Sequence, residues 1–251
     1  MKKAYLPVDR LMVAFDFVPD IIQKQGRNWL KWEVRKLIGS LAKTGQPIPV
    51  KMNSALRALG YDIIDEVHDA GLTFCADLKL VDIGNTLKTD GLFLQEARPE
   101  MLTVYCAEGI ISLKAIRLAI PQTEILGVTV LTDIDNAESK ILFRRGVPKE
   151  VLALANRGME ANFNGFVSSG LEAKSLRCNF GEVVSLNTPA VRPEHAIVQG
   201  DDQKRIVTPA KAFGAGADRI IVGRPITQAK SPYDAYMRTL DEINRFFEKQ
   251  Q

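Results

Sequence analysis

Charged residues interrupt several short apolar segments of this sequence. Asp77 and Lys79 are two residues apart in the apolar stretch 73–80, and Asp82 follows three residues later. Asp16 and Lys51 stand near the ends of two earlier apolar runs. In a strand, residues two apart point to the same face, so Asp77 and Lys79 are expected to lie together.

Ionisable side chains in such segments cannot be solvated like surface charges, and this leaves two interpretations. They can form a buried ion-pair network that only holds one end of the fold. Alternatively, they are a functional site, because sites that do chemistry collect ionisable groups with perturbed pKa values. The residue types alone leave both interpretations open.

The elements that must position these residues alternate along the whole chain. Short segments rich in Val, Ile and Leu are typical of buried parallel strands, and they cover 11–17, 48–52, 73–78, 101–105, 125–130, 165–168, 182–186 and 219–222. Amphipathic segments between them predict helices at 29–41, 63–70, 87–97, 113–118, 149–162, 209–215 and 233–247. Eight strand–helix units in 251 residues favour an α/β fold, a single-domain (β/α)8 TIM barrel over residues 1–251.

An open, doubly wound sheet is the alternative fold, and it usually carries a glycine-rich phosphate turn after its first strand. The segment 14–17 has no glycine, which favours the barrel. In a barrel, the active site lies at the carboxyl ends of the strands, where the charged residues fall. The stretch 188–207, after the seventh predicted strand, has no clear regular structure, and we expect it to be a mobile lid.

Composition narrows the classes of partner. The net charge is only +3 and the basic residues form no long block, so nucleic acid is not expected as a partner. No segment approaches the roughly 20 apolar residues of a membrane span, and no signal peptide is expected, so the predicted location is cytoplasmic. Cys75, Cys106 and Cys178 have neither zinc-ligand nor redox spacing and are interpreted as buried free thiols.

Several motifs of the chain resemble those of orotidine 5'-phosphate decarboxylases. The pattern Asp-x-Lys-x-x-Asp at 77–82, followed by Ile-x-Asn-Thr at 83–86, is similar to that family's signature. Further similar motifs follow in the family's order: Ala-Phe-Asp-Phe at 14–17, Val-Lys-Met at 50–52, Val-Thr-Val-Leu-Thr at 128–132, Thr-Pro-Ala-Val-Arg-Pro at 188–193, Gly-Asp-Asp-Gln-Lys-Arg at 200–205 and Val-Gly-Arg-Pro-Ile-Thr at 222–227. The resemblance covers nearly the whole chain.

The resemblance implies an enzyme that needs no cofactor and no metal and converts orotidine 5'-phosphate to UMP. It makes Lys79 the proton donor to carbon 6 of the pyrimidine and puts Asp77 against the substrate carboxylate. Lys51 and Asp82 then complete a Lys-Asp-Lys-Asp array. Asp82 and Thr86 are implied to reach the active site of a partner subunit in a homodimer.

The resemblance also implies which residues bind the rest of the substrate. Asp16 contacts the ribose and Thr132 the pyrimidine. The phosphate region is held by Gln203, Arg192, Gly223 and Arg224. Arginine suits this role because its guanidinium can bind a phosphate through two hydrogen bonds.

Some positions depart from the family pattern. Gly84 stands where a proline is usual, Val81 where a histidine or alanine is usual, and Asn53 where a glycine is usual. The segment between Asp16 and Lys51 is longer than in compact members, and its Trp29 and Trp32 are expected in the core or in an interface. His68 and His195 are not needed by the mechanism.

Two other functions compete with this interpretation. Related metal-dependent sugar-phosphate decarboxylases and aldolases share Asp-x-Lys-x-x-Asp but place a glutamate on strand two where this chain has Lys51. A cation at that position opposes a divalent metal. The other alternative, a phosphate-binding barrel without catalysis, does not account for the intact charge array.

Overall fold

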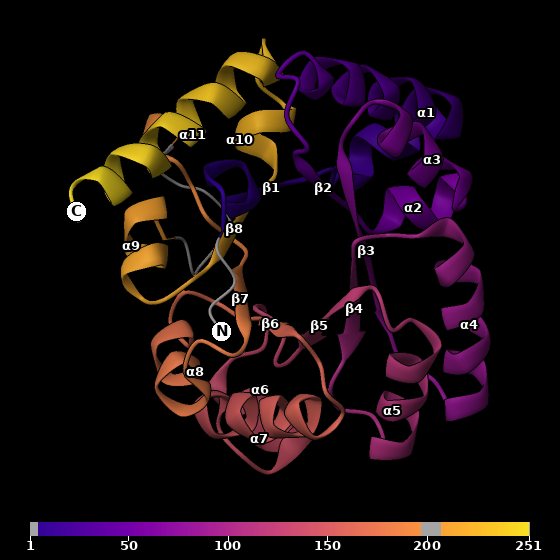
Figure 1. Ribbon diagram of the computed structural model, residues 1–251, viewed down its shortest axis with the longest axis vertical. Helices are drawn as coiled ribbons and strands as arrows, with labels where there is room; N and C mark the ends of the chain where they lie inside the picture. The colour runs from indigo at the N-terminus through magenta and orange to yellow at the C-terminus, as the bar shows by residue number, and fades with distance from the viewer. Residues whose placement is uncertain (1–4, 197–206, 251) are drawn as a thin grey trace.

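The computed structural model describes residues 5–196 and 207–250, and it confirms the predicted fold. Eight parallel strands close into one barrel in sequence order, β1 to β8, with β8 pairing back to β1 (Figure 1). The strands are β1 Leu11–Ala14, β2 Pro49–Met52, β3 Thr73–Leu80, β4 Met101–Tyr105, β5 Glu124–Val128, β6 Gly165–Val167, β7 Ser185–Thr188 and β8 Arg219–Val222. This is the (β/α)8 TIM barrel expected from the alternation of elements.

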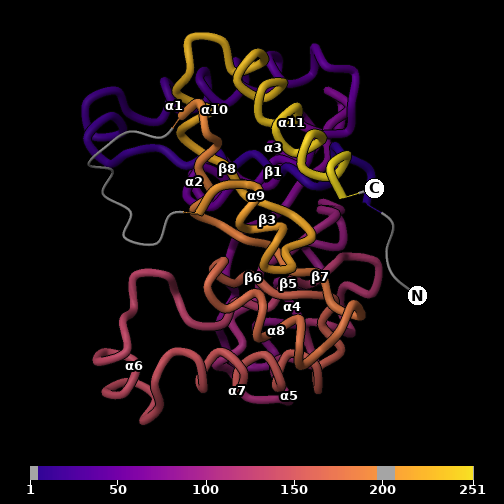
Figure 2. Tube along the Cα trace, turned by 90° about the vertical axis from the view of Figure 1, so that its left-hand side faces the viewer, coloured from indigo at the N-terminus to yellow at the C-terminus, as the bar shows by residue number. Residues whose placement is uncertain are grey.

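Helices surround the barrel on its outside, as Figure 1 shows. The longer ones are α1 Pro19–Ala42, α3 Asp62–Asp69, α4 Gly84–Ala97, α5 Ile110–Ala119, α7 Val147–Glu160 and α11 Pro232–Glu248. The shorter ones are α2 Ser54–Leu59, α6 Asn136–Phe143, α8 Ala173–Phe180, α9 Pro209–Gly214 and α10 Arg224–Thr227, with 3-10 turns at Pro7–Arg10 and Glu194–Ala196. In the side view of Figure 2, α6 stands away from the barrel beside α7. None of the helices in the described ranges is long and apolar enough to cross a membrane.

The alternation of each strand divides the core into two layers. In β1, Leu11 and Val13 face the helices, whereas Met12 and Ala14 face the barrel interior. The interior apolar cluster consists of Met12, Ala14, Cys75, Met101, Leu126 and Ile221. Asp77 is two residues after Cys75, so the same alternation turns its side chain into the barrel.

Strand seven begins three residues later than the apolar pattern predicted. The apolar run 182–186 suggested the strand, but β7 covers Ser185–Thr188, whose side chains are mainly polar. Ser185 and Asn187 are buried because they bond to charged groups inside the barrel. A polar strand of this kind has no apolar alternation by which sequence reasoning could find it.

The segment before β2 also differs from expectation. Helix α1 begins at Pro19, ten residues before the predicted start, and is broken at Gly26, which has a φ of 73°. Trp29 packs edge-on against Phe17, but Trp32 is 58% exposed, so the core position considered for it is wrong. Trp32 instead lies on the solvent side of α1 beside the ammonium of Lys36.

The three cysteines are free thiols, as predicted, but they are not all buried. Cys75 and Cys106 lie in the core, whereas Cys178 is exposed near the end of the amphipathic helix α8. The apolar context that suggested burial for Cys178 comes from residues on the other side of that helix, such as Leu176.

Candidate active site

Asp77 is the centre of the charged cluster at the carboxyl end of the barrel. Its side chain is almost completely buried, with 4% of the residue exposed. Lys79 Nζ donates to both carboxylate oxygens at 2.8 Å, and Lys51 Nζ donates to Oδ2. The hydroxyl of Thr103 on β4 donates to Oδ1 at 2.9 Å. The structure therefore brings Asp77, Lys79 and Lys51 together as the sequence predicted.

Lys51 enters the cluster from β2 and connects it to Asp16. Lys51 is 8% exposed, and its Nζ lies 3.6 Å from Asp16 Oδ2. Asp16 follows β1 by two residues and is largely exposed at the rim. The ends of three neighbouring strands thus supply an alternating row of charges, Asp16, Lys51, Asp77 and Lys79.

Attraction between opposite charges keeps Asp77 and Lys51 ionised despite their burial. Burial alone would raise the pKa of Asp77, but the ammonium groups of Lys51 and Lys79 hold its pKa well below the usual range. Burial would likewise lower the pKa of Lys51, yet the carboxylates of Asp77 and Asp16 raise it above its ordinary value. At neutral pH, the Asp77 carboxylate and the Lys51 ammonium are therefore both charged.

A pocket of about 200 Å³ opens beside this cluster. Its charged side is formed by Lys51, Asp77, Lys79 and Thr103. Its apolar side is formed by Met12, Leu126, Val128, Val130, Val167 and Ile221. Cys75 also lines it, and burial raises the pKa of that thiol to about 12, so it stays neutral. The pocket can hold a flat ring against an apolar wall while one edge meets the charges.

Thr132, predicted to contact a pyrimidine, lies in the same pocket after β5, as does Pro189 from the segment after β7. The structure also adds Ser168 at the end of β6, which sequence reasoning missed. Its hydroxyl is buried and has no hydrogen-bond partner among the described residues. A buried serine after a short strand has no distinctive sequence signal.

The residues expected near a phosphate lie around β7 and β8. Gly223 follows β8 directly and Arg224 begins α10, where it is partly buried. Arg192 is buried, and its backbone amide donates to Val207 O at 3.0 Å. This contact joins the two ends of the predicted lid. Gln203 lies outside the described residues, as does half of that lid, residues 197–206.

Asp82 and Thr86 are not part of this chain's own pocket. Both are exposed, Asp82 just beyond β3 and Thr86 in the first turn of α4. The Asp82 carboxylate accepts a hydrogen bond from the amide of Ile83. Large apolar side chains flank it at Val81 and Ile83, both more than half exposed.

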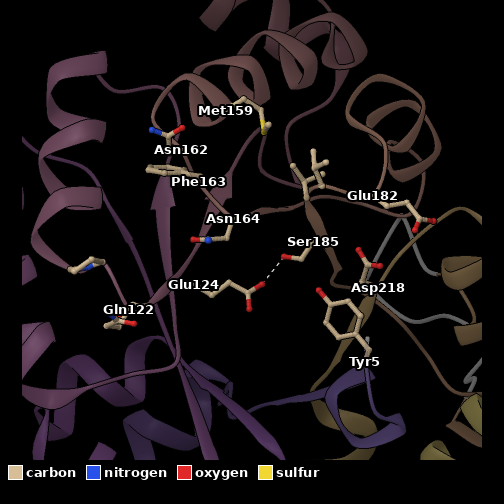
Figure 3. Close-up of a pocket in the computed structure, with 14 residues that line it drawn as sticks. Tyr5, Gln122, Glu124, Met159, Asn162, Phe163, Asn164, Glu182, Ser185 and Asp218 are labelled. Atoms are coloured by element: carbon tan, nitrogen blue, oxygen red, sulfur yellow. Dashed lines mark hydrogen bonds between the residues drawn. The ribbon is translucent and has the colours of Figure 1, made fainter. Parts of the chain in front are cut away.

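A second buried charge cluster lies at the opposite end of the barrel. Arg219 at the start of β8 bonds both carboxylate oxygens of Glu124, at 2.8 and 3.0 Å, and Asn187 Oδ1 at 2.9 Å. Ser185 donates to Glu124 at 2.7 Å, and the ring of Tyr5 lies 5.0 Å from the guanidinium. Glu124, Ser185 and Tyr5 of this cluster line a pocket of about 530 Å³. Figure 3 shows these three side chains, with Tyr5 and Asp218 on the side opposite Asn164.

The parts of the chain that the structure describes contain no group of three or more His, Cys, Asp or Glu side chains arranged to hold a metal ion. His68 bonds Glu100 at 3.2 Å, away from the pocket. His195 lies in the 3-10 turn after β7, where burial and Arg238 lower its pKa.

Comparison with known proteins decides the family. The sequence profile described as "Orotidine 5'-phosphate decarboxylase / HUMPS family" matches residues 9–239. The chain belongs to this family. The family inferred from the motifs is therefore confirmed, and the enzyme class that goes with it is a decarboxylase, a carboxy-lyase.

Individual members of the family are similar to this chain over almost their full lengths. The orotidine 5'-phosphate decarboxylase of Afipia carboxidovorans is 36% identical over 94% of this chain and 95% of its own length. That of Hydrogenovibrio crunogenus is 33% identical over 97% and 98%. Among solved structures, the orotidine 5'-phosphate decarboxylase of Lactobacillus acidophilus matches with a TM-score of 0.73 and 25% identity, covering 93% of this chain and 98% of that chain.

Proposed function

We propose that this protein decarboxylates orotidine 5'-phosphate to UMP and carbon dioxide in de novo pyrimidine biosynthesis, without a cofactor. The observation that carries the proposal is the buried Lys51–Asp77–Lys79 cluster beside a pocket with one apolar wall. Family membership and the names of the relatives support the same reaction. The pathway calls for a location in the cytoplasm.

Asp77 acts on the bound substrate by electrostatic repulsion. The substrate carboxylate on carbon 6 would lie near the Asp77 carboxylate, which stays ionised because of its two lysine partners. Two like charges about 4 Å apart repel by roughly 4 kcal/mol at an effective dielectric constant near 20. This repulsion disappears when neutral carbon dioxide leaves, so it favours the product side of the step.

Lys79 completes the reaction as the general acid. When the bond between carbon 6 and the carboxylate breaks, the electron pair stays on carbon 6. The Lys79 ammonium stabilises that negative charge and transfers a proton to it, which forms UMP. Solvent returns a proton to the Lys79 amine. Lys79 suits this role because its Nζ is in the pocket and already beside Asp77.

Lys51 distinguishes this reaction from metal-assisted chemistry on the same fold. Its ammonium is buried, and Asp77 and Asp16 hold it in the charged form. A divalent cation at this position would be repelled, whereas a carboxylate substrate is attracted. This supports the decarboxylase over the metal-dependent sugar-phosphate enzymes of the alternative interpretation.

The remainder of the substrate binds through groups that do not react. Asp16 would contact the ribose, Thr132 the pyrimidine, and Arg224 with Gly223, Arg192 and Gln203 the phosphate. The binding energy of the phosphate can hold the ring in place and order the lid.

The active site is completed by a second subunit in a homodimer. Asp82 and Thr86 are exposed beyond β3, outside the pocket of their own chain, and exposed Val81 and Ile83 flank them. In a two-fold dimer, each subunit can therefore lend these residues to the other. Asp82 would then add the second carboxylate to the Lys-Asp-Lys-Asp array.

The ultraviolet absorbance of orotidine 5'-phosphate provides the test of the reaction. Purified protein treated with a chelator should convert the substrate to UMP at the same rate as untreated protein. Activity that vanishes with the chelator and returns with magnesium would contradict the metal-free reaction. No conversion under either condition would contradict the decarboxylase itself.

Complementation tests the shared site. Lys79→Ala and Asp82→Ala are each expected to be inactive, but coexpression should restore activity. Half of a random mixture is heterodimer with one intact site in two, so about a quarter of wild-type activity should return. A demonstrated heterodimer without recovered activity would place both groups in one chain's site.

A further inference from the structure

Thr103 is buried at the junction of the two residues that the proposed reaction needs most. We propose that Thr103 is a positioning residue, whose hydroxyl fixes the backbone of Lys79 and the carboxylate of Asp77 at once. This inference rests on the proposed decarboxylation and adds a residue from β4 to its machinery. Thr103 is 1% exposed and lines the pocket beside both partners.

The pairing of β3 with β4 leaves Thr103 in an unusual place. Ala76 pairs with Leu102 and Leu80 pairs with Val104, and the register shifts between these two pairs. Three residues of β3, from Asp77 to Lys79, therefore stand opposite Thr103 alone. Such a β-bulge interrupts the regular ladder, so backbone groups within it need other partners.

The Thr103 hydroxyl supplies one of these partners and also reaches the carboxylate. Lys79 N donates to Thr103 Oγ1 at 2.9 Å, and Thr103 Oγ1 donates to Asp77 Oδ1 at 2.9 Å. A hydroxyl can donate one hydrogen bond while accepting another, so a single atom joins the two residues. An apolar side chain of the same shape could do neither.

Lys79 has an unusual backbone conformation that the hydrogen bond from its amide to Thr103 can stabilise. Lys79 has a φ of 47°, in the left-handed region that a residue with a side chain seldom adopts. Arg98 and Arg144 are also left-handed, but they end helices α4 and α6, where this conformation is common. Lys79 adopts it inside a strand, at a site where its Nζ must meet the reacting carbon.

The rate of the chemical step should therefore depend on Thr103, although Thr103 transfers no proton to the substrate. If the hydroxyl is lost, Lys79 can return to an extended backbone, and its Nζ moves relative to Asp77 and the pocket. Misplacement of a catalytic group by about 1 Å can cost roughly 100-fold in rate. Binding of UMP, which has no carboxylate to orient, should change little.

Isosteric variants test the proposal. Thr103→Val should lower kcat by roughly 10- to 100-fold, while KM and the inhibition constant of UMP change by less than about threefold. Thr103→Ser should restore most of kcat because it keeps the hydroxyl. Thr123→Val is the matched control, since Thr123 is also buried and donates to Pro99 O at 3.1 Å at the far end of the barrel.

Crystal structures of the two Thr103 variants provide a readout that does not depend on turnover. Lys79 should leave the left-handed region in Thr103→Val and remain there in Thr103→Ser. An unchanged Lys79 in Thr103→Val would overturn the proposal, even if the wild-type protein failed to decarboxylate orotidine 5'-phosphate. Normal kcat in folded Thr103→Val, equally slow Val and Ser variants, or a parallel loss of UMP binding would overturn it too.

Discussion

The two ends of the barrel each contain a buried charge cluster, but the clusters are built differently. At the amino end, Arg219 is matched to Glu124 by two hydrogen bonds; Arg219 Nη1 also donates to Asn187, and Glu124 Oε1 also accepts from Ser185. At the carboxyl end, two ammonium groups share the single buried carboxylate of Asp77. The first cluster is a closed pair, whereas in the second the charges of Asp16, Lys51, Asp77 and Lys79 alternate, and the last three line an open pocket.

This difference supports a structural role for the first cluster and a ligand-binding role for the second. Glu124 and Arg219 already satisfy each other, so an added ligand would have to break strong bonds. The Lys51–Asp77–Lys79 cluster lines a pocket, where its ammonium groups can attract an anionic substrate. Burial and pairing alone therefore do not identify an active site, whereas charged groups that line a pocket and remain available to a ligand support one.

Among the substitutions in the two clusters, loss of the proposed general acid Lys79 should have the largest effect, and the effect should be on kcat. Lys79→Ala removes the proposed proton donor, and general acid catalysis contributes roughly 100- to 10,000-fold, so kcat should fall by at least that much. The fold should survive because Lys51 still pairs with Asp77. Lys88→Ala, an exposed change on α4, is the control. Near-normal turnover by folded Lys79→Ala would remove Lys79 from the mechanism.

Breaking the amino-end cluster should lower the free energy of unfolding and leave kcat unchanged. Arg219→Met leaves the largely buried Glu124 without its main partner, and breaking a buried pair in this way typically costs about 3–5 kcal/mol in the free energy of unfolding. Urea denaturation measures this loss, and kcat per folded molecule should stay normal. Arg35→Met removes a comparable but exposed bond to Glu66 and should destabilise the fold much less, because solvent screens that pair. Equal losses for both variants would contradict the structural role of the cluster.

Arg224 provides a further test of the ligand-binding end of the barrel, because it is expected to act only through the substrate phosphate. Arg224→Ala is expected to lose about 1.5–3 kcal/mol of transition-state stabilisation with orotidine 5'-phosphate. This is the usual contribution of a hydrogen bond to a charged group. It should lose little with orotidine, which lacks the phosphate. The exposed Lys230 provides the control for loss of a nearby positive charge. Equal losses on both substrates would show that Arg224 supports the fold instead.

The smallest effect concerns acid stability at the carboxyl end. The pKa of Asp77 is depressed in the folded protein, so its carboxylate stabilises the fold fully above the unfolded pKa of about 3.9. That stability is lost as the pH falls below this value, with a slope of at most about 1.4 kcal/mol per pH unit for one proton. Asp77→Asn should show a flatter decline between pH 5 and 3 in urea unfolding. Identical slopes in both proteins would contradict the depressed pKa.

Sequence reasoning found the carboxyl-end cluster because its signal is local. Asp77 and Lys79 lie in one strand, and Lys51 interrupts another apolar strand at the corresponding end. The amino-end cluster was missed because Glu124 and Arg219 are 95 residues apart and meet only when the barrel closes. The predicted bounds of β7 were wrong for the same reason. Its polar residues are buried because they bond to those distant partners.

Thr103 marks another limit of sequence reasoning. Its role depends on a register shift between β3 and β4, and strand register is not visible in the order of residues of either strand. Strand alternation correctly places Asp77 and Lys79 on one face, but it gives no hint of the left-handed backbone at Lys79. The short helices α2, α6, α8 and α10 were missed because few turns give weak periodicity.

The central claim is that the carboxyl-end cluster removes the carboxylate of orotidine 5'-phosphate and protonates carbon 6. Substrate labelled with carbon-13 in the carboxylate allows both events to be followed together by nuclear magnetic resonance. With chelator-treated wild-type protein, the label should appear as carbon dioxide and bicarbonate while an equal amount of UMP forms. Folded Lys79→Ala should leave the label on the substrate, whereas Arg219→Met should release it normally per folded molecule. Label that stays on the ring with wild-type protein, or is released equally by Lys79→Ala, would contradict the account.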